Sequence, residues 1–203
     1  MLRAKIAVLV SGGGTNLQAL IDAQKSGIIS SGEIVLVISN NENAYALTRA
    51  KENGIKTAVV KRNGGSQSAF ESEISALLEN NAIDLIVLAG FMSILSENFT
   101  SRYPKRIINV HPSLIPSFCG KGFYGLRVHE AALSRGVKVT GATVHFVNEI
   151  PDGGEIIMQK AVKILKTDTP QSLQKRVMKI AEWKILPQAA QLVCENIIKG
   201  ERK

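Results

Sequence analysis

The sequence has few cysteines and no long apolar run, and both absences exclude whole classes of protein. Cys119 and Cys194 stand far apart without a C-x-x-C spacing, which argues against a zinc knuckle and against a disulfide framework. No segment approaches the roughly 18 consecutive apolar residues of a membrane span. The apolar run at residues 6–10 meets glycines at once and is shorter than the core of a signal peptide. We therefore predict a cytoplasmic protein that binds no metal.

Aromatic residues are also scarce, at 5% of the chain, and they do not alternate with basic residues. Lys and Arg number 25 against 17 Asp and Glu, a net charge of +8 that is concentrated late in the chain. Such an excess attracts polyanions, steers small anionic substrates, or forms a solvated surface. Because no nucleic-acid motif accompanies it, we predict small-molecule ligands, no nucleic-acid or membrane partner, and a monomer or weak homodimer.

The first half of the chain alternates apolar segments with helical patterns. Strands are predicted at residues 6–10, 33–39, 57–60, 84–89 and from residue 106, with a helical pattern that begins at Leu17 and helices near 44–53 and 68–80. The strands are continuously apolar, as in a parallel sheet covered on both faces. The pattern predicts a doubly wound, mostly parallel, Rossmann-like α/β sheet, whose ligands bind at the carboxyl ends of the strands.

The second half predicts a different arrangement. Residues 137–147 alternate in polarity and residues 155–162 return after a turn, which indicates a C-terminal antiparallel hairpin. A short helix is predicted at 128–133. A long C-terminal helix is predicted from Pro170 toward Pro187, with a second helical piece at 188–199. No linker or repeat interrupts the chain, so residues 1–203 are predicted to form a single domain.

Two stretches carry the chemistry. Ser11 and Gly12–Asn16, written SGGGTN, follow the first strand and precede a helix, which outlines an anion site, although a tight turn alone would also explain the glycines. The stretch lacks the Walker lysine, and Leu17 replaces the last glycine of the dinucleotide pattern. At the fifth strand end, Asn109 and His111 project to the same side, as an amide donor and an imidazole held together.

Four motifs occur in order and together resemble one family. They are SGGGTNLQ at residues 11–18, LAGFMSIL at 88–95, NVHPSLIP at 109–116 and HFVNEIPDGG at 145–154. Across the whole chain the sequence is similar to the phosphoribosylglycinamide formyltransferases of the formyltransferase superfamily. The resemblance implies formyl transfer from 10-formyltetrahydrofolate to the amine of glycinamide ribonucleotide in purine biosynthesis, without a metal. It also implies a nucleotide-binding half at 1–110 and a catalytic, folate-binding half at 111–203.

The resemblance also implies roles for individual residues. Asn109, His111 and Asp152 would be catalytic, with Asn109 stabilising an oxyanion, His111 donating a hydrogen bond or moving a proton, and Asp152 orienting His111 or a water. Substrate binding is implied for Gly13, Gly14, Thr15, Asn16, Gly90 and Glu182. Folate binding is implied for Met92, Ser93, Ile94, Leu95, Val147, Asn148 and Glu149.

Ordinary structural roles compete with several of these assignments. An asparagine at a strand end is often a turn former, and an aspartate before glycines is common in hairpins. His145 is predicted to pack beside the site, and His129 to be a surface or structural residue. Met92 and Leu95 fit core packing nearly as well. Ser93 and Trp183 depart from the family pattern, which has arginine and histidine there.

Two other activities stay open at this point. Formyltetrahydrofolate deformylase shares the three catalytic residues, but it carries an added N-terminal domain, for which we expect no room here. The tRNA-specific formyltransferase carries an added C-terminal domain, for which we also expect no room. A non-catalytic Rossmann-type nucleotide-binding module would explain the glycines but not Asn109, His111 and Asp152.

Overall fold

The computed structural model describes residues 2–62 and 64–200; residues 1, 63 and 201–203 of the predicted single domain lie outside the described residues. The described chain forms a seven-stranded sheet in the order β3-β2-β1-β4-β5-β6-β7. The first five strands in this order are parallel, and β6 and β7 add antiparallel neighbours. The strands are β1 (Ala4–Val10), β2 (Gly32–Ser39), β3 (Lys56–Val59), β4 (Leu85–Leu88), β5 (Ile107–His111), β6 (Val139–Phe146) and β7 (Ile156–Lys163). The predicted doubly wound sheet with an antiparallel hairpin is confirmed.

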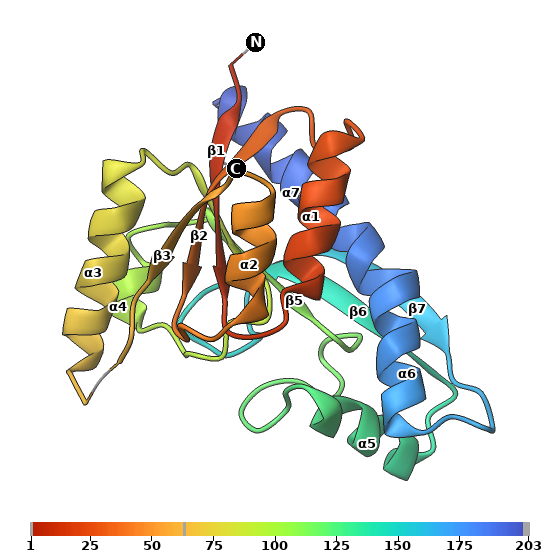
Figure 1. The fold of residues 1–203 in the computed structure, drawn as a ribbon. Coiled ribbons are helices and arrows are strands. Elements are labelled where there is room, and N and C mark those ends of the chain that lie inside the picture. Colours follow the sequence, from red (N-terminus) through yellow and green to blue (C-terminus); the bar gives the residue numbers. More distant parts are fainter. Residues whose placement is uncertain (1, 63, 201–203) are drawn as a thin grey trace.

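Helices cover both faces of this sheet (Figure 1). They are α1 (Thr15–Lys25), α2 (Tyr45–Glu52), α3 (Gln67–Asn80), α4 (Glu97–Thr100), α5 (Leu126–Arg135), α6 (Pro170–Val177) and α7 (Trp183–Ile198), with a π-helical turn, η1 (Met178–Glu182), between the last two. One buried cluster joins the sheet to α1, α2, α6 and α7, and another joins it to α3 and α4. Among the described helices, none is long and apolar enough to cross a membrane.

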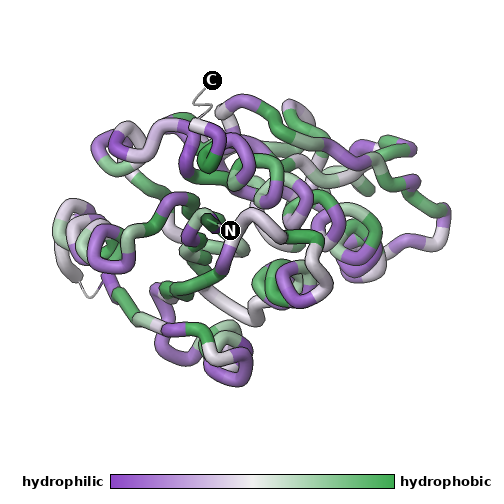
Figure 2. Tube along the Cα trace, turned by 90° about the horizontal axis from the view of Figure 1, so that it is seen from above, coloured by the Kyte–Doolittle hydropathy of each residue, from purple (hydrophilic) through white to green (hydrophobic). Residues whose placement is uncertain are grey.

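Strand β1 shows why the sheet needs both layers. Ile6, Val8 and Val10 belong to one buried cluster, while Ala7 and Leu9 belong to the other. Successive strand residues point to opposite faces, so a strand that is apolar throughout must be covered on both sides. In the view along the molecule from above, apolar segments (green) gather in the middle and polar segments (purple) mark the outer turns and helix faces (Figure 2).

The C-terminal helical segment differs from its prediction. A break at Pro187 was predicted, but Pro187 lies inside α7, and the interruption falls earlier, at η1. A π-helical turn shifts the helical hydrogen-bond ladder just ahead of the proline, where the missing N–H would otherwise interrupt that ladder. The prediction of two separate pieces divided at the proline is therefore wrong, and the predicted long C-terminal helix is confirmed.

Candidate active site

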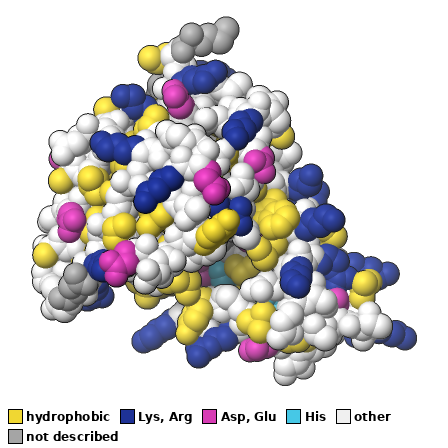
Figure 3. Space-filling view, in the orientation of Figure 1, with side chains coloured by type: hydrophobic (Ala, Val, Ile, Leu, Met, Phe, Trp, Pro, Cys, Tyr) yellow, Lys and Arg dark blue, Asp and Glu magenta, His cyan; other side chains and the backbone are white. Residues whose placement is uncertain are grey.

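Three neighbouring strands end at the same edge of the sheet. β1 pairs with β4 up to Leu9 and Leu88, and β4 pairs with β5 up to Leu88 and Asn109. The loop after β1, Gly90 after β4 and the end of β5 therefore meet there, as parallel strands require. Figure 3 shows histidine atoms (cyan) in a hollow in the lower part of the molecule. The candidate site lies in this region.

Four polar side chains form a connected cluster. Asn109 lies opposite His145 in the β5–β6 pairing, and its Nδ2 is 3.2 Å from His145 Nε2. His145 Nε2 is 3.6 Å from Oδ1 of Asp152, and Oδ2 of Asp152 is 3.4 Å from Nδ1 of His111. Asp152 thus lies between the two histidines. The three predicted catalytic residues come together, and His145 joins them.

Backbone contacts fix the tautomers of both rings. Nδ1 of His145 donates to the carbonyl of Phe146 at 2.7 Å, so its Nε2 is free to accept from Asn109. Nε2 of His111 donates to the carbonyl of Phe118 at 2.8 Å. Because a neutral imidazole carries one proton, Nδ1 of His111 can donate to Asp152 only in the imidazolium form. A charged His111 would therefore pair with Asp152, but burial holds the pKa of this ring below its usual value.

The hairpin turn between β6 and β7 delivers Asp152. Asp152 has a left-handed backbone, with φ +57°, and is followed by two glycines. A Cβ on Gly154 would lie 1.8 Å from the carbonyl oxygen of Phe146, and one on Gly153 would lie 2.6 Å from the side chain of Ile150. The turn therefore requires glycine at both positions, since no side chain fits. Asp-Gly-Gly is a structural device that aims the carboxylate into the site.

The charges in the cluster oppose the effect of burial. Burial works to raise the pKa of Asp152, but the neighbouring rings of His145 and His111 and the backbone N–H of Gly120, which donates at 2.8 Å, bring that pKa below its usual value. Burial lowers the pKa of His111, and Asp152 opposes this. Asp152 is therefore a carboxylate in the neutral pH range, and its charge supports protonation of His111.

The glycine loop after β1 leaves the start of α1 without a side-chain cap. Gly14 is the N-cap residue, with φ +71°, and a Cβ there would lie 2.6 Å from the side chain of Ala46. Arg49 Nε donates to the carbonyl of Gly13 at 2.9 Å and braces the loop from α2. The first-turn N–H groups of α1 have no side-chain acceptor and face the end of the sheet, which is suitable geometry for an anion.

Asn16 and Glu182 form a buried pair across the fold. Nδ2 of Asn16 donates to Oε2 of Glu182 at 2.8 Å, and this contact joins α1 to the π-helical turn. Burial raises the pKa of Glu182 to about 7, although the Asn16 hydrogen bond lowers it. Oδ1 of Asn16 is buried and has no donor among the described residues. Two acceptor groups thus lie together beside the glycine loop, where a ligand with two hydroxyl donors would satisfy them.

The predicted folate residues line two adjoining cavities. A cavity of about 130 Å³ lies against Asn109, His145 and Asp152. Of the predicted folate-binding residues, it is lined by Ser93, Ile94, Leu95, Val147, Asn148 and Glu149. Met92 lines a neighbouring hollow of about 400 Å³ with Arg62 and Gln67. Met92 and Ile94 are exposed apolar side chains, at 56% and 68%, so core packing does not account for them. Leu95 is 6% exposed and packs in the core while it borders the cavity.

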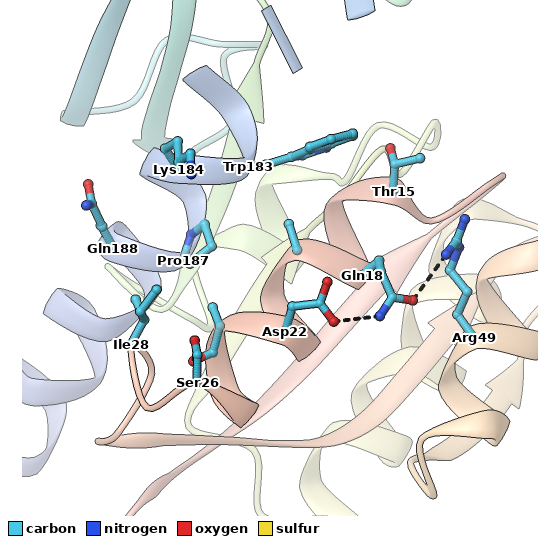
Figure 4. A pocket seen from close by; sticks show the side chains of 12 residues that line it. Thr15, Gln18, Asp22, Ser26, Ile28, Arg49, Trp183, Lys184, Pro187 and Gln188 are labelled. Carbon is cyan, nitrogen blue, oxygen red and sulfur yellow. Dashed lines mark hydrogen bonds between the residues drawn. The ribbon is translucent and has the colours of Figure 1, made fainter. Parts of the chain in front are cut away.

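A larger cavity of about 470 Å³ lies between α1 and α7, away from the catalytic cluster (Figure 4). Arg49 donates to Gln18 at 3.1 Å and Gln18 donates to Asp22 at 2.9 Å along one side of it. Thr15 and Trp183 line this cavity, so Trp183 faces it although it follows Glu182 in sequence. The cavity touches the site only through Thr15. The titratable cluster lies against the smaller cavity, which is lined by Asn109, His145 and Asp152.

Some functional residues were missed or underrated from sequence. His145 was predicted to pack beside the site, but it contacts both Asn109 and Asp152; its place opposite Asn109 depends on β5–β6 register, which the sequence does not show. Arg62, beside the hollow with Met92, was not predicted. His129 is fully buried, so a surface position is wrong, and its ring nitrogens have no partner among the described residues.

The described residues contain no group of three or more His, Cys, Asp or Glu placed to hold a metal ion. The fold and the cluster instead define a Rossmann-like protein with an acyl-transfer type of site, in which an amide, two imidazoles and a carboxylate converge beside an anion-binding loop. The formyl transferase family model matches residues 4–190, and the chain belongs to this family.

Relatives that are similar to the chain carry consistent names. Phosphoribosylglycinamide formyltransferase of Haemophilus influenzae is 44% identical over 184 residues, covering 90% of this chain and 84% of that protein. The trifunctional purine biosynthetic protein adenosine-3 of Homo sapiens is 45% identical over 97% of this chain, but this chain spans only 19% of its length. The crystal structure of glycinamide ribonucleotide transformylase 1 from Symbiobacterium toebii has a TM-score of 0.89 at 39% identity, covering 96% of this chain and 89% of that one.

Proposed function

We propose that this protein transfers a formyl group from 10-formyltetrahydrofolate to the amine of glycinamide ribonucleotide, a step of purine biosynthesis. The main support is the cluster of Asn109, His145, Asp152 and His111, with contacts of 3.2 to 3.6 Å between the side chains. This cluster borders the cavity that the predicted folate-binding residues line. It lies at the same edge of the sheet as the glycine loop. A donor with an apolar ring and an anionic acceptor would meet there.

The cluster contains the groups that formyl transfer needs. The acceptor amine attacks the formyl carbon, a C–N bond forms, and negative charge develops on the formyl oxygen. Nδ2 of Asn109 donates one hydrogen to His145, which leaves its second hydrogen for that oxygen. His111 in its imidazolium form directs one N–H to the carbonyl of Phe118 and the other toward Asp152, so it supports the developing negative charge through its positive charge and not through a further hydrogen bond. The proton lost by the attacking amine passes toward Asp152, directly or through a water, and N10 of the folate takes a proton as its bond to the formyl carbon breaks.

The acceptor would bind along the edge between Gly90 and α1. Its phosphate lies at the uncapped first turn, against backbone groups of Gly13, Gly14, Thr15 and Asn16. Its ribose hydroxyls donate to Glu182 and to the unpartnered Oδ1 of Asn16. Gly90, with φ +72° and no atom within 4 Å of a Cβ position, leaves open space for the glycinamide. Each group of this ligand then meets a complementary group of the site.

The folate would occupy the two adjoining cavities. Its pterin ring fits the cavity of about 130 Å³ beside the catalytic cluster. Its tail then runs past Met92 and Ile94, whose exposed apolar side chains suit an aromatic linker. Arg62, at the far hollow, offers a cation for the terminal carboxylates. The reactive N10 atom lies between these two parts, next to Asn109.

We also propose residues 1–203 as a single formyltransferase domain, with the nucleotide-binding half at 1–110 and the catalytic and folate-binding half at 111–203. The unbroken sheet from β3 to β7 supports the single domain. Two site elements cross the division, because Glu182 lies with the acceptor residues and Ser93 lies with the folate residues. The division at residue 110 therefore follows the order of the chain, and it does not separate two independent binding sites. The absence of nucleic-acid, membrane and metal partners, and the monomer or weak homodimer, stay predictions.

The decisive experiment compares acceptor-dependent and acceptor-independent turnover. Purified protein with 10-formyltetrahydrofolate should produce tetrahydrofolate only when glycinamide ribonucleotide is present, and a formylated ribonucleotide should accumulate in equal amount. Release of formate at the same rate without the acceptor would instead indicate a deformylase. Ligand binding without folate consumption would indicate a nucleotide-binding module. Either of these results would refute the proposal.

A further inference from the structure

We propose that Glu71, on the outer helix α3, is a positioning residue that holds the folate-binding loop in its binding conformation. This inference rests on the proposed function. It assigns a role to a residue that lines neither of the two cavities proposed for folate. Glu71 is a carboxylate on a helix that covers one face of the sheet, yet only 6% of it is exposed. A buried carboxylate needs hydrogen-bond donors, and those of Glu71 come from the loop that follows β4.

Glu71 accepts three hydrogen bonds from two residues. Oε1 accepts from the backbone N–H of Ser96 and from Nε2 of Gln67, both at 2.6 Å, and Oε2 accepts from the hydroxyl of Ser96 at 2.5 Å. Gln67 also donates to the carbonyl of Ile94 at 2.9 Å. One helix therefore holds the loop at two points, through Glu71 directly and through Gln67.

The loop segment between these points is the proposed folate wall. Ser93, Ile94 and Leu95 line the cavity next to the catalytic cluster, and Ser96 follows them and caps α4 by accepting from Phe99 N–H. This segment has no strand or helix of its own to hold its backbone. Since a ligand recognised by backbone groups requires those groups to be fixed beforehand, contacts from neighbouring elements decide its affinity.

Contacts from the other side of the loop complete the support. The hydroxyl of Ser11, at the end of β1, accepts from the backbone N–H of Met92 at 2.8 Å. Asn40, after β2, donates to Oγ of Ser93 at 2.9 Å. Ser11 and Asn40 lie near the acceptor side of the sheet edge, whereas Glu71 and Gln67 approach from α3. The contacts of Glu71 can be removed without touching the catalytic cluster or the glycine loop, which makes Glu71 a clean test.

The experiment replaces Glu71 with residues of similar volume. Glu71→Met keeps the approximate size of the side chain but removes the carboxylate. The backbone N–H of Ser96, its hydroxyl and the amide of Gln67 then lose their hydrogen-bond acceptor. Since such a loss changes an equilibrium roughly tenfold, we expect KM for 10-formyltetrahydrofolate to rise about tenfold. We expect kcat and KM for the ribonucleotide to stay within about twofold. Glu71→Gln, whose amide can accept from Ser96 N–H and donate to Ser96 Oγ, should retain folate affinity close to the parent.

Matched variants and a binding measurement separate positioning from folding. Glu73→Gln removes a charge from the exposed face of the same helix and should change neither KM. Gln67→Met, which removes the donations to Ile94 and to Glu71 but leaves both Ser96 contacts in place, should produce part of the Glu71→Met effect. It also provides the test if Glu71→Met does not fold. Calorimetry with tetrahydrofolate measures the Kd of the folate-binding loop without turnover. A parent protein that is inactive but still binds tetrahydrofolate would therefore refute the proposed function and not this inference.

Two results would overturn the inference. An unchanged folate KM and an unchanged tetrahydrofolate Kd in both Glu71→Met and Gln67→Met would show that the loop holds its conformation without α3. Equal increases in KM for folate and for the ribonucleotide would show that Glu71 acts on the stability of the whole fold. A selective loss of folate affinity that Glu71→Gln restores would support the assigned role.

Discussion

Acceptor binding should depend on the ionisation of Glu182, which makes the substitution Glu182→Gln informative. Burial raises the pKa of this carboxyl to about 7, and its one described hydrogen bond comes from Nδ2 of Asn16. Ribose hydroxyls donate best to a carboxylate. Protonation of Glu182 below pH 7 would therefore remove an acceptor and weaken binding of glycinamide ribonucleotide, whereas catalysis on bound substrate would not depend on it.

The size of the effect follows from the pKa. With a pKa of about 7, roughly one Glu182 in eleven is ionised at pH 6 and roughly ten in eleven at pH 8. Apparent affinity scales with the fraction in the binding-competent form, so KM for the ribonucleotide should fall about tenfold between these two pH values. The glutamine variant carries no ionisable group. Its KM should be higher than that of the parent at pH 8 and should show no such fall.

The assay measures KM for the ribonucleotide from pH 6 to pH 8, at saturating folate, in both proteins. The acceptor's phosphate itself titrates near pH 6, so the difference between the two profiles isolates the contribution of Glu182. Gln substitution of the half-buried Glu195, further along α7, serves as a control for general charge effects on that helix. Parallel profiles for parent and Glu182→Gln would refute the assignment of Glu182 to the ribose.

Four further substitutions test other parts of the site. Asp152→Asn removes the charge that faces His111, so kcat should fall about 100-fold or more in steady-state kinetics; a parent-like kcat would contradict its role in proton transfer. Asn109→Ala should lower kcat about 100- to 1,000-fold with little change in folate KM, and a pure KM effect would argue against oxyanion binding. Gly154→Ala places a Cβ 1.8 Å from the carbonyl oxygen of Phe146 and should lower both Tm and kcat, whereas Gly65→Ala, with open space, should not. His129→Leu should reduce the loss of stability in acid: because burial lowers the pKa of His129 to about 4, the unfolded chain binds a proton below pH 6.5 that the folded chain does not bind, and the free energy of unfolding should fall by about 3 kcal/mol more in the parent than in the variant from pH 6.5 to pH 4.

The sheet and the pair Asn109 and His111 could be predicted because their signals are local, whereas Asp152 was found through the family resemblance. Each parallel strand is a continuous apolar run, and the order of strands and helices is that of a doubly wound sheet. Asn109 and His111 share a strand end, and their spacing alone places them together. The contact between Asp152 and His111 could be seen only in the structure. It depends on a hairpin turn about 40 residues further along the chain, whose position relative to β5 is set by strand register.

Other features depend on tertiary contacts that leave no local pattern. The four-residue helix α4 is too short for helical periodicity to show, and the π-helical turn before Pro187 changed the outcome expected from proline chemistry. The contacts of His145 depend on strand register. Glu71 is part of an ordinary amphipathic helix in sequence, and its burial appears only when the loop after β4 packs against it. Sequence reasoning thus finds the reactive groups more readily than the groups that hold them.

The loop after Pro116 unites the two halves of the proton-transfer pair. The carbonyl of Phe118 accepts from His111, and the N–H of Gly120 donates to Asp152, two residues further on. One contact favours a protonated imidazole and the other favours an ionised carboxylate, so a three-residue segment supports both charges of the same pair. In the proposed reaction, the negative charge on the formyl oxygen of the tetrahedral intermediate would also favour a protonated His111. Protonation of His111 is then supported from three directions at the moment of transfer, while burial opposes it in the free enzyme. If formyl transfer proceeds as proposed, this support would be greatest in the transition state, where it lowers the barrier.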